Sequence, residues 1–188
     1  MKKVLFAALA LLGFHTSASA QTSALKVNIF SPLVNTGSFF FEHQVSEHAS
    51  AQLGGLFTAW SSGDTKITGF AITPEYRCYL SDSKPALEGF YLAPFVRYQN
   101  LTLTVANAYT NANGNAMDGK ASLNTVGGGV LAGYQFLFKH RFTLDGFLGP
   151  SYNGGSLKIT AGDASQSFDA NSFLGFGLRT GVTFGVAF

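Results

Sequence analysis

Residues 173–188 read FLGFGLRTGVTFGVAF. From Leu174 onward, the even positions carry mostly bulky apolar side chains, and the odd positions carry glycine or other small residues with a single arginine, Arg179. A period of two predicts a β-strand, because successive side chains point to opposite faces. A small inner face suits a narrow, crowded interior, so we expect the closing strand of a small transmembrane β-barrel. The side chains expected to face lipid are Phe176, Leu178, Val182, Phe184 and Val186.

The composition of the whole chain points to the same class. Only 12% of the 188 residues are charged, against about 25% in soluble domains. The chain holds 19 phenylalanines and 22 glycines, and no run after residue 14 is apolar for the 18 residues that a membrane helix needs. A closed barrel is then the only way left to cross a bilayer.

The N-terminus has the pattern of a cleaved signal peptide. Lys2 and Lys3 precede an apolar stretch over residues 4–14, and Ala18-Ser19-Ala20 fits the small-residue cleavage rule. We expect residues 1–20 to be removed and residues 21–188 to form one barrel domain in the outer membrane. Cleavage would remove two of the twelve basic residues and none of the ten acidic ones, leaving no net charge. Such a chain has no basic field with which to bind nucleic acid.

The remaining sequence predicts an all-β fold, an eight-stranded antiparallel up-and-down transmembrane β-barrel. Short connections at 46–48 and 139–141 contrast with long ones at 105–122 and 158–172, as periplasmic turns contrast with external loops in such barrels. Pro74, Pro94 and Pro150 fall inside predicted strands, so we expect each to mark a bulge or a strand end. The predicted strands are Leu25–Leu33, Ser38–Val45, Ala49–Trp60, Thr68–Leu80, Gly89–Thr104, Leu123–Phe138, Phe142–Leu157 and Phe173–Phe188.

Several short motifs resemble a known group. The chain is similar to the small eight-stranded outer-membrane barrels of the OmpA/OmpX kind, and more narrowly to a family of short bacterial outer-membrane proteins. The resemblance implies contact with outer-membrane lipid and lipopolysaccharide. It also implies that Phe188 is the C-terminal aromatic signal by which the last strand meets the barrel assembly machinery. The motifs are residues 28–33 (NIFSPL), 41–42 (FE), 73–79 (TPEYRCY), 89–91 (GFY) and 93–98 (APFVRY).

Seven charged side chains fall on the faces predicted to line the lumen. The lumen of an eight-stranded barrel is only wide enough for side chains to fill it, and an unpaired buried charge is costly. We expect Arg77 or Arg97 to pair with Glu75, Glu42 or Asp145 in a plug of salt bridges. A gated pore or a proton path is the alternative. The seven residues of this lumen charge network are Lys26, Glu42, Glu75, Arg77, Arg97, Asp145 and Arg179.

No catalytic, cofactor-binding or metal-binding constellation is predicted. A lipid hydrolase needs a base beside its nucleophile, but His43, His48 and His140 all fall near predicted periplasmic turns. The glycines at 127–129 and in the last strand precede no helix, so close packing explains them better than phosphate binding. We expect a monomeric, non-catalytic protein with a structural or surface-interaction role through its external loops. The alternative is a small pore or a carrier for a small or apolar ligand.

Overall fold

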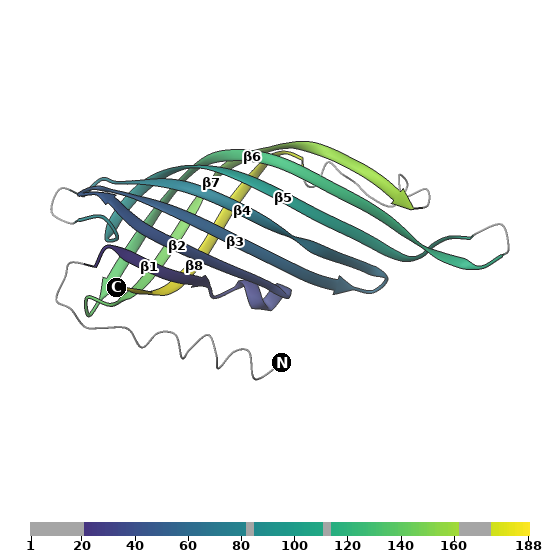
Figure 1. Cartoon of the computed structure of the whole chain (residues 1–188), viewed down its shortest axis with the longest axis horizontal. Coiled ribbons are helices and arrows are strands. Elements are labelled where there is room, and N and C mark those ends of the chain that lie inside the picture. Colours follow the sequence, from purple (N-terminus) through teal and green to yellow (C-terminus); the bar gives the residue numbers. More distant parts are fainter. Residues whose placement is uncertain (1–20, 82–84, 111–113, 162–173) are drawn as a thin grey trace.

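The computed structural model describes residues 21–81, 85–110, 114–161 and 174–188. Eight antiparallel strands close into one barrel in chain order, with β1 beside β8 (Figure 1), which confirms the predicted fold class. The predicted signal peptide lies outside the described residues and stays a prediction. Among those residues, no helix is long and apolar enough to cross a membrane. The strands are β1 (Ser23–Asn28), β2 (Thr36–Ser46), β3 (Ala49–Ser62), β4 (Thr65–Tyr79), β5 (Gly89–Thr110), β6 (Ala116–Phe138), β7 (Phe142–Ala161) and β8 (Gly175–Ala187).

Backbone hydrogen bonds between the first and last strands close the barrel. Lys26 lies opposite Gly185 in the ladder between β1 and β8. At the end of this seam, the Ser23 amide donates to the Phe188 carbonyl (3.0 Å) and the Phe188 amide donates to the Ser23 carbonyl (2.8 Å). The terminal residue therefore completes the ladder, which leaves the barrel without an open edge at this seam.

The outer surface of the barrel is apolar. On β8, Phe176 and Leu178 are 90% and 69% exposed, while Thr183 and Ala187 on the opposite face are buried. The same alternation runs through the other strands, and an apolar outer band of this kind is the surface of a membrane barrel. Exposed apolar side chains elsewhere on the wall include Phe39, Phe41, Leu53, Phe57, Ile72, Val96, Val126, Val130 and Leu148.

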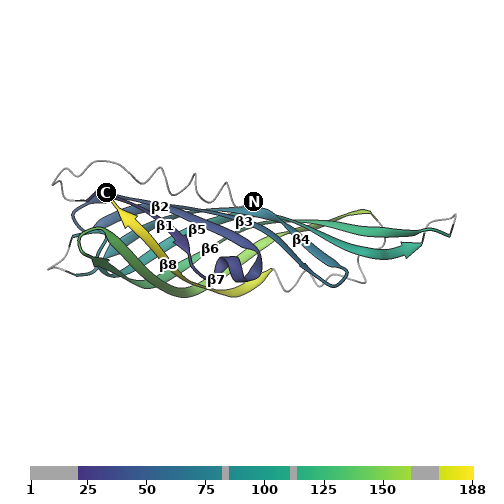
Figure 2. The same ribbon diagram turned by 90° about the horizontal axis from the view of Figure 1, so that it is seen from below.

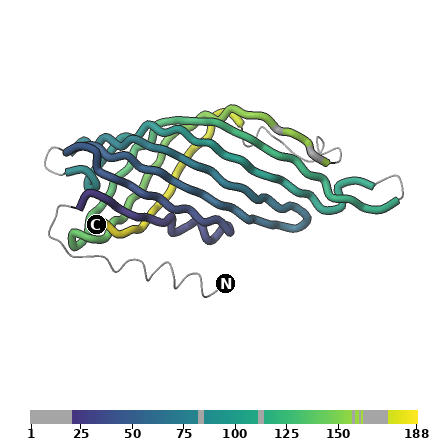
Figure 3. Tube along the Cα trace, viewed as in Figure 1, coloured from purple at the N-terminus to yellow at the C-terminus, as the bar shows by residue number. Residues whose placement is uncertain are grey.

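The two ends of the barrel differ in how far their hairpins project (Figure 1). We call the end that holds the C-terminus and the start of β1 the termini end, and the opposite one the hairpin end (Figures 1 and 2). At the hairpin end β3 and β4 are joined by a two-residue turn, in which Gly63 has a φ of +54°. The β5–β6 hairpin projects furthest from the barrel (Figure 3).

The structure corrects the predicted loop over residues 105–122. Most of that stretch is ladder, because β5 runs to Thr110 and β6 begins at Ala116, with an irregularity between Val105 and Tyr109. Where this extension begins, the buried side chains of Leu101, Leu103 and Leu123 pack into one apolar cluster. Beyond the membrane the backbone pairing continues, but the side chains no longer need to alternate in polarity. Periodicity alone therefore underestimates the length of β5 and β6.

Two other boundary predictions were wrong. The first predicted strand, Leu25–Leu33, ends at Asn28, and a 3-10 helix, η1 (Ser31–Val34), follows with Pro32 in its first turn. Proline suits that place because it has no backbone donor to lose there. The predicted loop over 158–172 begins later, because β7 continues to Ala161; residues 162–173 lie outside the described residues.

The three strand prolines mark neither a bulge nor a strand end. Pro74 lies opposite Leu53 of β3, and the β4–β5 register is the same on both sides of it, at Ile72↔Tyr98 and Glu75↔Phe95. Each proline retains its ladder position on one side only, Pro94 toward β6 and Pro150 toward β8. A strand has two neighbours, so a residue that lacks one donor interrupts a single seam and leaves the strand continuous.

Candidate functional site in the barrel lumen

Four of the predicted lumen charges meet in the half of the barrel near the termini end. The Lys26 ammonium lies 2.5 Å from Glu42 Oε2 and 3.5 Å from Asp145 Oδ2. Arg77 Nη1 donates to Asp145 Oδ2 at 2.9 Å and lies 3.6 Å from Glu42 Oε2. All four residues are fully buried. Two cations and two carboxylates thus balance, which is what burial of charge requires.

Neutral side chains bond to most of the remaining polar groups of this cluster, although Arg77 Nε is buried without a hydrogen-bond partner. The Tyr91 hydroxyl donates to Asp145 Oδ1 (2.8 Å), and the Tyr79 hydroxyl donates to Glu42 Oε1 (2.7 Å), which also accepts from Ser50. Gln135 Oε1 accepts from both Lys26 (2.8 Å) and Arg77 (3.2 Å), while its amide donates to the Leu87 carbonyl (2.9 Å).

We refer to these side chains together as the charge plug. The sequence does not reveal the roles of its neutral members, although the alternation of β5 and β6 places Tyr91 and Gln135 on the inward face. The charge plug consists of Lys26, Glu42, Ser50, Arg77, Tyr79, Tyr91, Gln135 and Asp145.

Glu75 connects the charge plug to the hairpin half of the lumen. Its Oε2 accepts from Arg77 Nη2 (3.3 Å) and Gln52 Nε2 (2.9 Å), and its Oε1 accepts from Arg179 Nη2 (2.6 Å). Arg97 is different: no carboxylate of the described residues lies within ion-pair distance of it. Its Nε is buried without a hydrogen-bond partner. The structure therefore brings six of the seven predicted charges together and leaves Arg97 apart.

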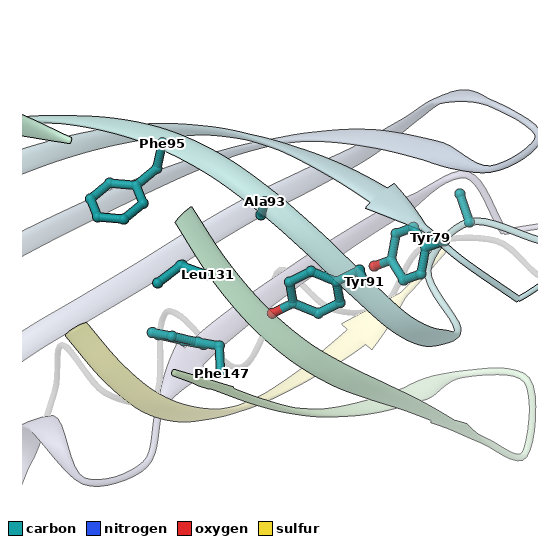
Figure 4. Close-up of a cluster of buried hydrophobic side chains, with 7 residues drawn as sticks. Tyr79, Tyr91, Ala93, Phe95, Leu131 and Phe147 are labelled. Carbon is teal, nitrogen blue, oxygen red and sulfur yellow. The ribbon is translucent and has the colours of Figure 1, made fainter. Parts of the chain in front are cut away.

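Aromatic rings separate the charge plug from the rest of the lumen. Tyr79 and Tyr91 pack at 5.4 Å between ring centroids, and the Arg77 guanidinium lies 4.3 Å from the centroid of the Tyr91 ring. Further along the lumen, Phe95 and Phe147 lie on the side away from Tyr79 (Figure 4). Both rings contact the Arg179 guanidinium, at 4.6 Å and 5.1 Å from their centroids. We call Phe95 and Phe147 the aromatic floor.

The inward glycines behave differently along the barrel. A Cβ at Gly133 would meet the Tyr91 ring, and one at Gly181 would come within 2.6 Å of the Phe147 ring, so these glycines make room for the aromatic rings of the plug and the floor. At Gly175 a Cβ would meet nothing within 4 Å, and at Gly177 only the Ser151 hydroxyl at 3.4 Å. The predicted close packing is therefore right at Gly181 and at Gly127, where a Cβ would meet Asn153, and wrong at Gly175 and Gly177.

Two adjoining cavities occupy the hairpin half of the lumen. The larger, of about 450 Å³, and the smaller, of about 200 Å³, share Arg97, Arg179 and Thr180 in their linings. Phe95 lines the larger cavity and Phe147 the smaller, so the aromatic floor bounds both. We call the two together the arginine chamber. The larger cavity is also lined by Gln99, Thr125, Ser151, Asn153, Gly177 and Leu178.

The three histidines of the described residues lie away from this chamber. His48 and His140 are exposed in the turns of the termini end. His43 Nδ1 lies 2.9 Å from Ser23 Oγ, also at the termini end. Within the described part of the chain, no group of three or more His, Cys, Asp or Glu side chains could hold a metal ion.

A family model described as "Protein of unknown function (DUF3575)" matches residues 5–158. The chain belongs to this family. The match takes in β1 to β6 and most of β7, and therefore six of the seven predicted lumen charges, from Lys26 to Asp145; Arg179 lies beyond its end. No match was found among curated proteins.

Three solved structures resemble this member of the DUF3575 family, all at low sequence identity. The N-terminal β-barrel domain of Pseudomonas aeruginosa OprF is 11% identical, with coverage of 90% of this chain and 100% of that one and a TM-score of 0.40. Acinetobacter baumannii CarO is 13% identical, with coverage of 93% and 99% and a TM-score of 0.47. A major outer membrane protein from Thermus thermophilus is 15% identical, with coverage of 90% and 100% and a TM-score of 0.48.

Proposed function

We propose that the protein is a non-catalytic outer-membrane barrel, closed at its termini end, that presents the β5–β6 hairpin at the cell surface for interaction. The observation that carries the proposal is the charge plug. Lys26, Glu42, Arg77 and Asp145 are fully buried and bonded to one another across the lumen. These bonds across the lumen support a resting barrel without a continuous aqueous path.

The pore alternative requires the plug to open, and each bond in it opposes opening. Removing one partner of a buried ion pair costs about 3–5 kcal/mol, and the plug holds several pairs that share atoms. Thermal opening is therefore rare. Single-channel recording in planar bilayers should show no sustained conductance from the intact protein, and steady conductance of nanosiemens size would establish the pore instead.

An enzyme on external lipid would need a nucleophile and base at the hairpin end. The Ser23–His43 contact lies at the other end, beside the terminal residue Phe188. No carboxylate among the described residues is bonded to that imidazole, so the orienting group of a catalytic triad is missing. Purified protein should release no fatty acid from lipopolysaccharide; its release would overturn the non-catalytic assignment.

The orientation in the membrane is part of the proposal. With both termini in the periplasm, β8 and Phe188 would meet the barrel assembly machinery from inside, and the hairpin would stand outside among lipopolysaccharide as part of a monomer. The lysines test this directly, because Lys66 and Lys120 are exposed at the hairpin end and Lys139 at the termini end. A membrane-impermeant amine reagent on intact cells should modify Lys66 and Lys120 and spare Lys139. The reverse pattern would invert the topology.

The hairpin itself is tested by truncation. Replacing residues 106–119 with Asn-Gly should leave the barrel folded, because the pairs from Thr104↔Lys120 back to Gly89↔Gln135 are retained. Cells displaying the truncated protein should lose any adhesion or aggregation that the wild type confers. Replacing Gly63-Asp64 with Asn-Gly is the matched control, since it alters the neighbouring turn alone. Unchanged adhesion in the truncated variant would show that the hairpin is not the interaction surface.

A further inference from the structure

Among the described residues, the lumen carries four cations (Lys26, Arg77, Arg97 and Arg179) and three carboxylates (Glu42, Glu75 and Asp145). Glu75 is the acid nearest the arginine chamber, and it is already bonded to Arg77, Gln52 and Arg179. Arg97 Nε and Arg179 Nη1 are both buried without a hydrogen-bond partner. Buried donors of this kind are costly to leave unsatisfied, and more so on charged groups.

Arg77 Nε is buried without a partner as well, but it lies in the charge plug, whereas Arg97 and Arg179 line the same open space. Arg97 and Arg179 border the cavity of about 450 Å³ and also the smaller one beside it. The larger volume falls within the range of about 300–1,000 Å³ typical of small-ligand sites. Arg97 is only half-buried, so part of its side chain is accessible to solvent.

The rest of the lining determines what kind of ligand fits. Hydroxyls of Thr125, Ser151 and Thr180 and amides of Gln99 and Asn153 surround the larger cavity, so a ligand there can form many hydrogen bonds. Phe95 supplies an apolar floor on one side. Gly177 leaves its part of the wall without a side chain, which preserves the space.

We propose that the arginine chamber is a binding site for a small hydroxylated oxyanion, such as a sugar acid or a sugar phosphate. Arg97 and Arg179 hold the anionic group, and the hydroxyl and amide side chains hold the body of the ligand. The planar guanidinium fork matches the oxygens of both carboxylate and phosphate. The charge plug prevents the ligand from passing through the barrel. The ligand therefore enters the chamber from the hairpin end and leaves by the same end.

The test is isothermal titration of the refolded barrel in a neutral detergent. The anionic probes are glucuronate, glucose 6-phosphate and inorganic phosphate, and the controls are neutral glucose and cationic glucosamine. We expect saturable binding of at least one anionic probe and none of the controls. Whether glucuronate or the phosphates bind then fixes the anionic group. No saturable binding of any anionic probe in the millimolar range would overturn the proposal.

Arg97→Gln should weaken that binding at least ten-fold. This variant is expected to fold, because Arg97 has no ion pair among the described residues and its removal leaves no carboxylate without a partner. Lys66→Gln is the matched control, since it removes one positive charge at the same end outside the chamber, and it should bind as the wild type does. Equal affinity in the Arg97→Gln and wild-type proteins would also overturn the proposal.

A second readout comes from the only tryptophan in the chain. Trp60 lines a further cavity together with Arg97 and Gln99, next to the chamber. Its emission should change as the anionic probe saturates the site, with the same midpoint as the titration heat. The Arg97→Gln variant, whose fold is checked by the heat-dependent shift of its mobility on a gel, should lose this response.

Discussion

Asp145→Asn should destabilise the barrel by removing one charge from the plug and leaving its shape intact. The Asp145 carboxylate accepts from Arg77 at 2.9 Å and from the Tyr91 hydroxyl at 2.8 Å, and it lies 3.5 Å from the Lys26 ammonium. In the variant, Glu42 and Glu75 would remain for Lys26 and Arg77. One buried positive charge would therefore lose its nearest partner.

The size of the effect follows from these contacts. Breaking a buried ion pair by removing one partner costs about 3–5 kcal/mol. The asparagine oxygen still accepts one hydrogen bond, so we expect the lower end of that range, about 3 kcal/mol. Asp118→Asn is the matched control, because Asp118 is exposed on the β5–β6 hairpin and accepts a long hydrogen bond of 3.4 Å from the Asn107 backbone amide. Its effect should stay within about 0.5 kcal/mol.

The measurement is equilibrium unfolding by urea in lipid vesicles, followed by the mobility difference between folded and unfolded protein on a gel. A double-mutant cycle with Arg77→Gln then isolates the pair, whose coupling energy should fall within about 0.5–3 kcal/mol. If Asp145→Asn changed the free energy of unfolding no more than Asp118→Asn does, the plug would not be the closed, bonded structure described above.

Two further substitutions test the faces of the wall. Leu148 is 51% exposed and lies opposite Thr180, near the middle of β8, so Leu148→Arg should lower the free energy of unfolding by about 2–4 kcal/mol. Leu33→Arg in η1, at the hairpin end, should lower it by about 0–1 kcal/mol. Similar losses at both sites would contradict the lipid-facing assignment of Leu148. Gly133→Ala should cost about 1–3 kcal/mol, because the added Cβ meets the Tyr91 ring and comes within 2.9 Å of the Gly146 carbonyl oxygen. Gly146→Ala meets nothing within 4 Å and should change the unfolding free energy by less than about 0.5 kcal/mol in the same assay.

The fold could be predicted because the information that specifies it is local. Side-chain alternation is a property of neighbouring residues, so Glu75 and Arg77 on one face and Ile72 and Tyr76 on the other are readable without any knowledge of the partner strand. Low charge and the absence of long apolar runs then leave a barrel as the membrane fold. Periodicity fails only where the membrane no longer imposes it, as along the outer part of the β5–β6 hairpin.

The sequence by itself also determined which charges face inward, but the tertiary structure alone decided which of them meet. Lys26 and Asp145 are 119 residues apart, and Arg179 and Glu75 are 104 apart. Their contacts depend on strand register and on the tilt of strands around the closed ring, which set the depth of each side chain. Arg77 and Arg97 each lie three residues after a proline, Pro74 and Pro94. Strand register nevertheless places Arg77 among carboxylates and Arg97 beside a cavity. The position of a side chain along the barrel axis depends on the register and tilt of all eight strands, so the sequence of one strand does not determine it.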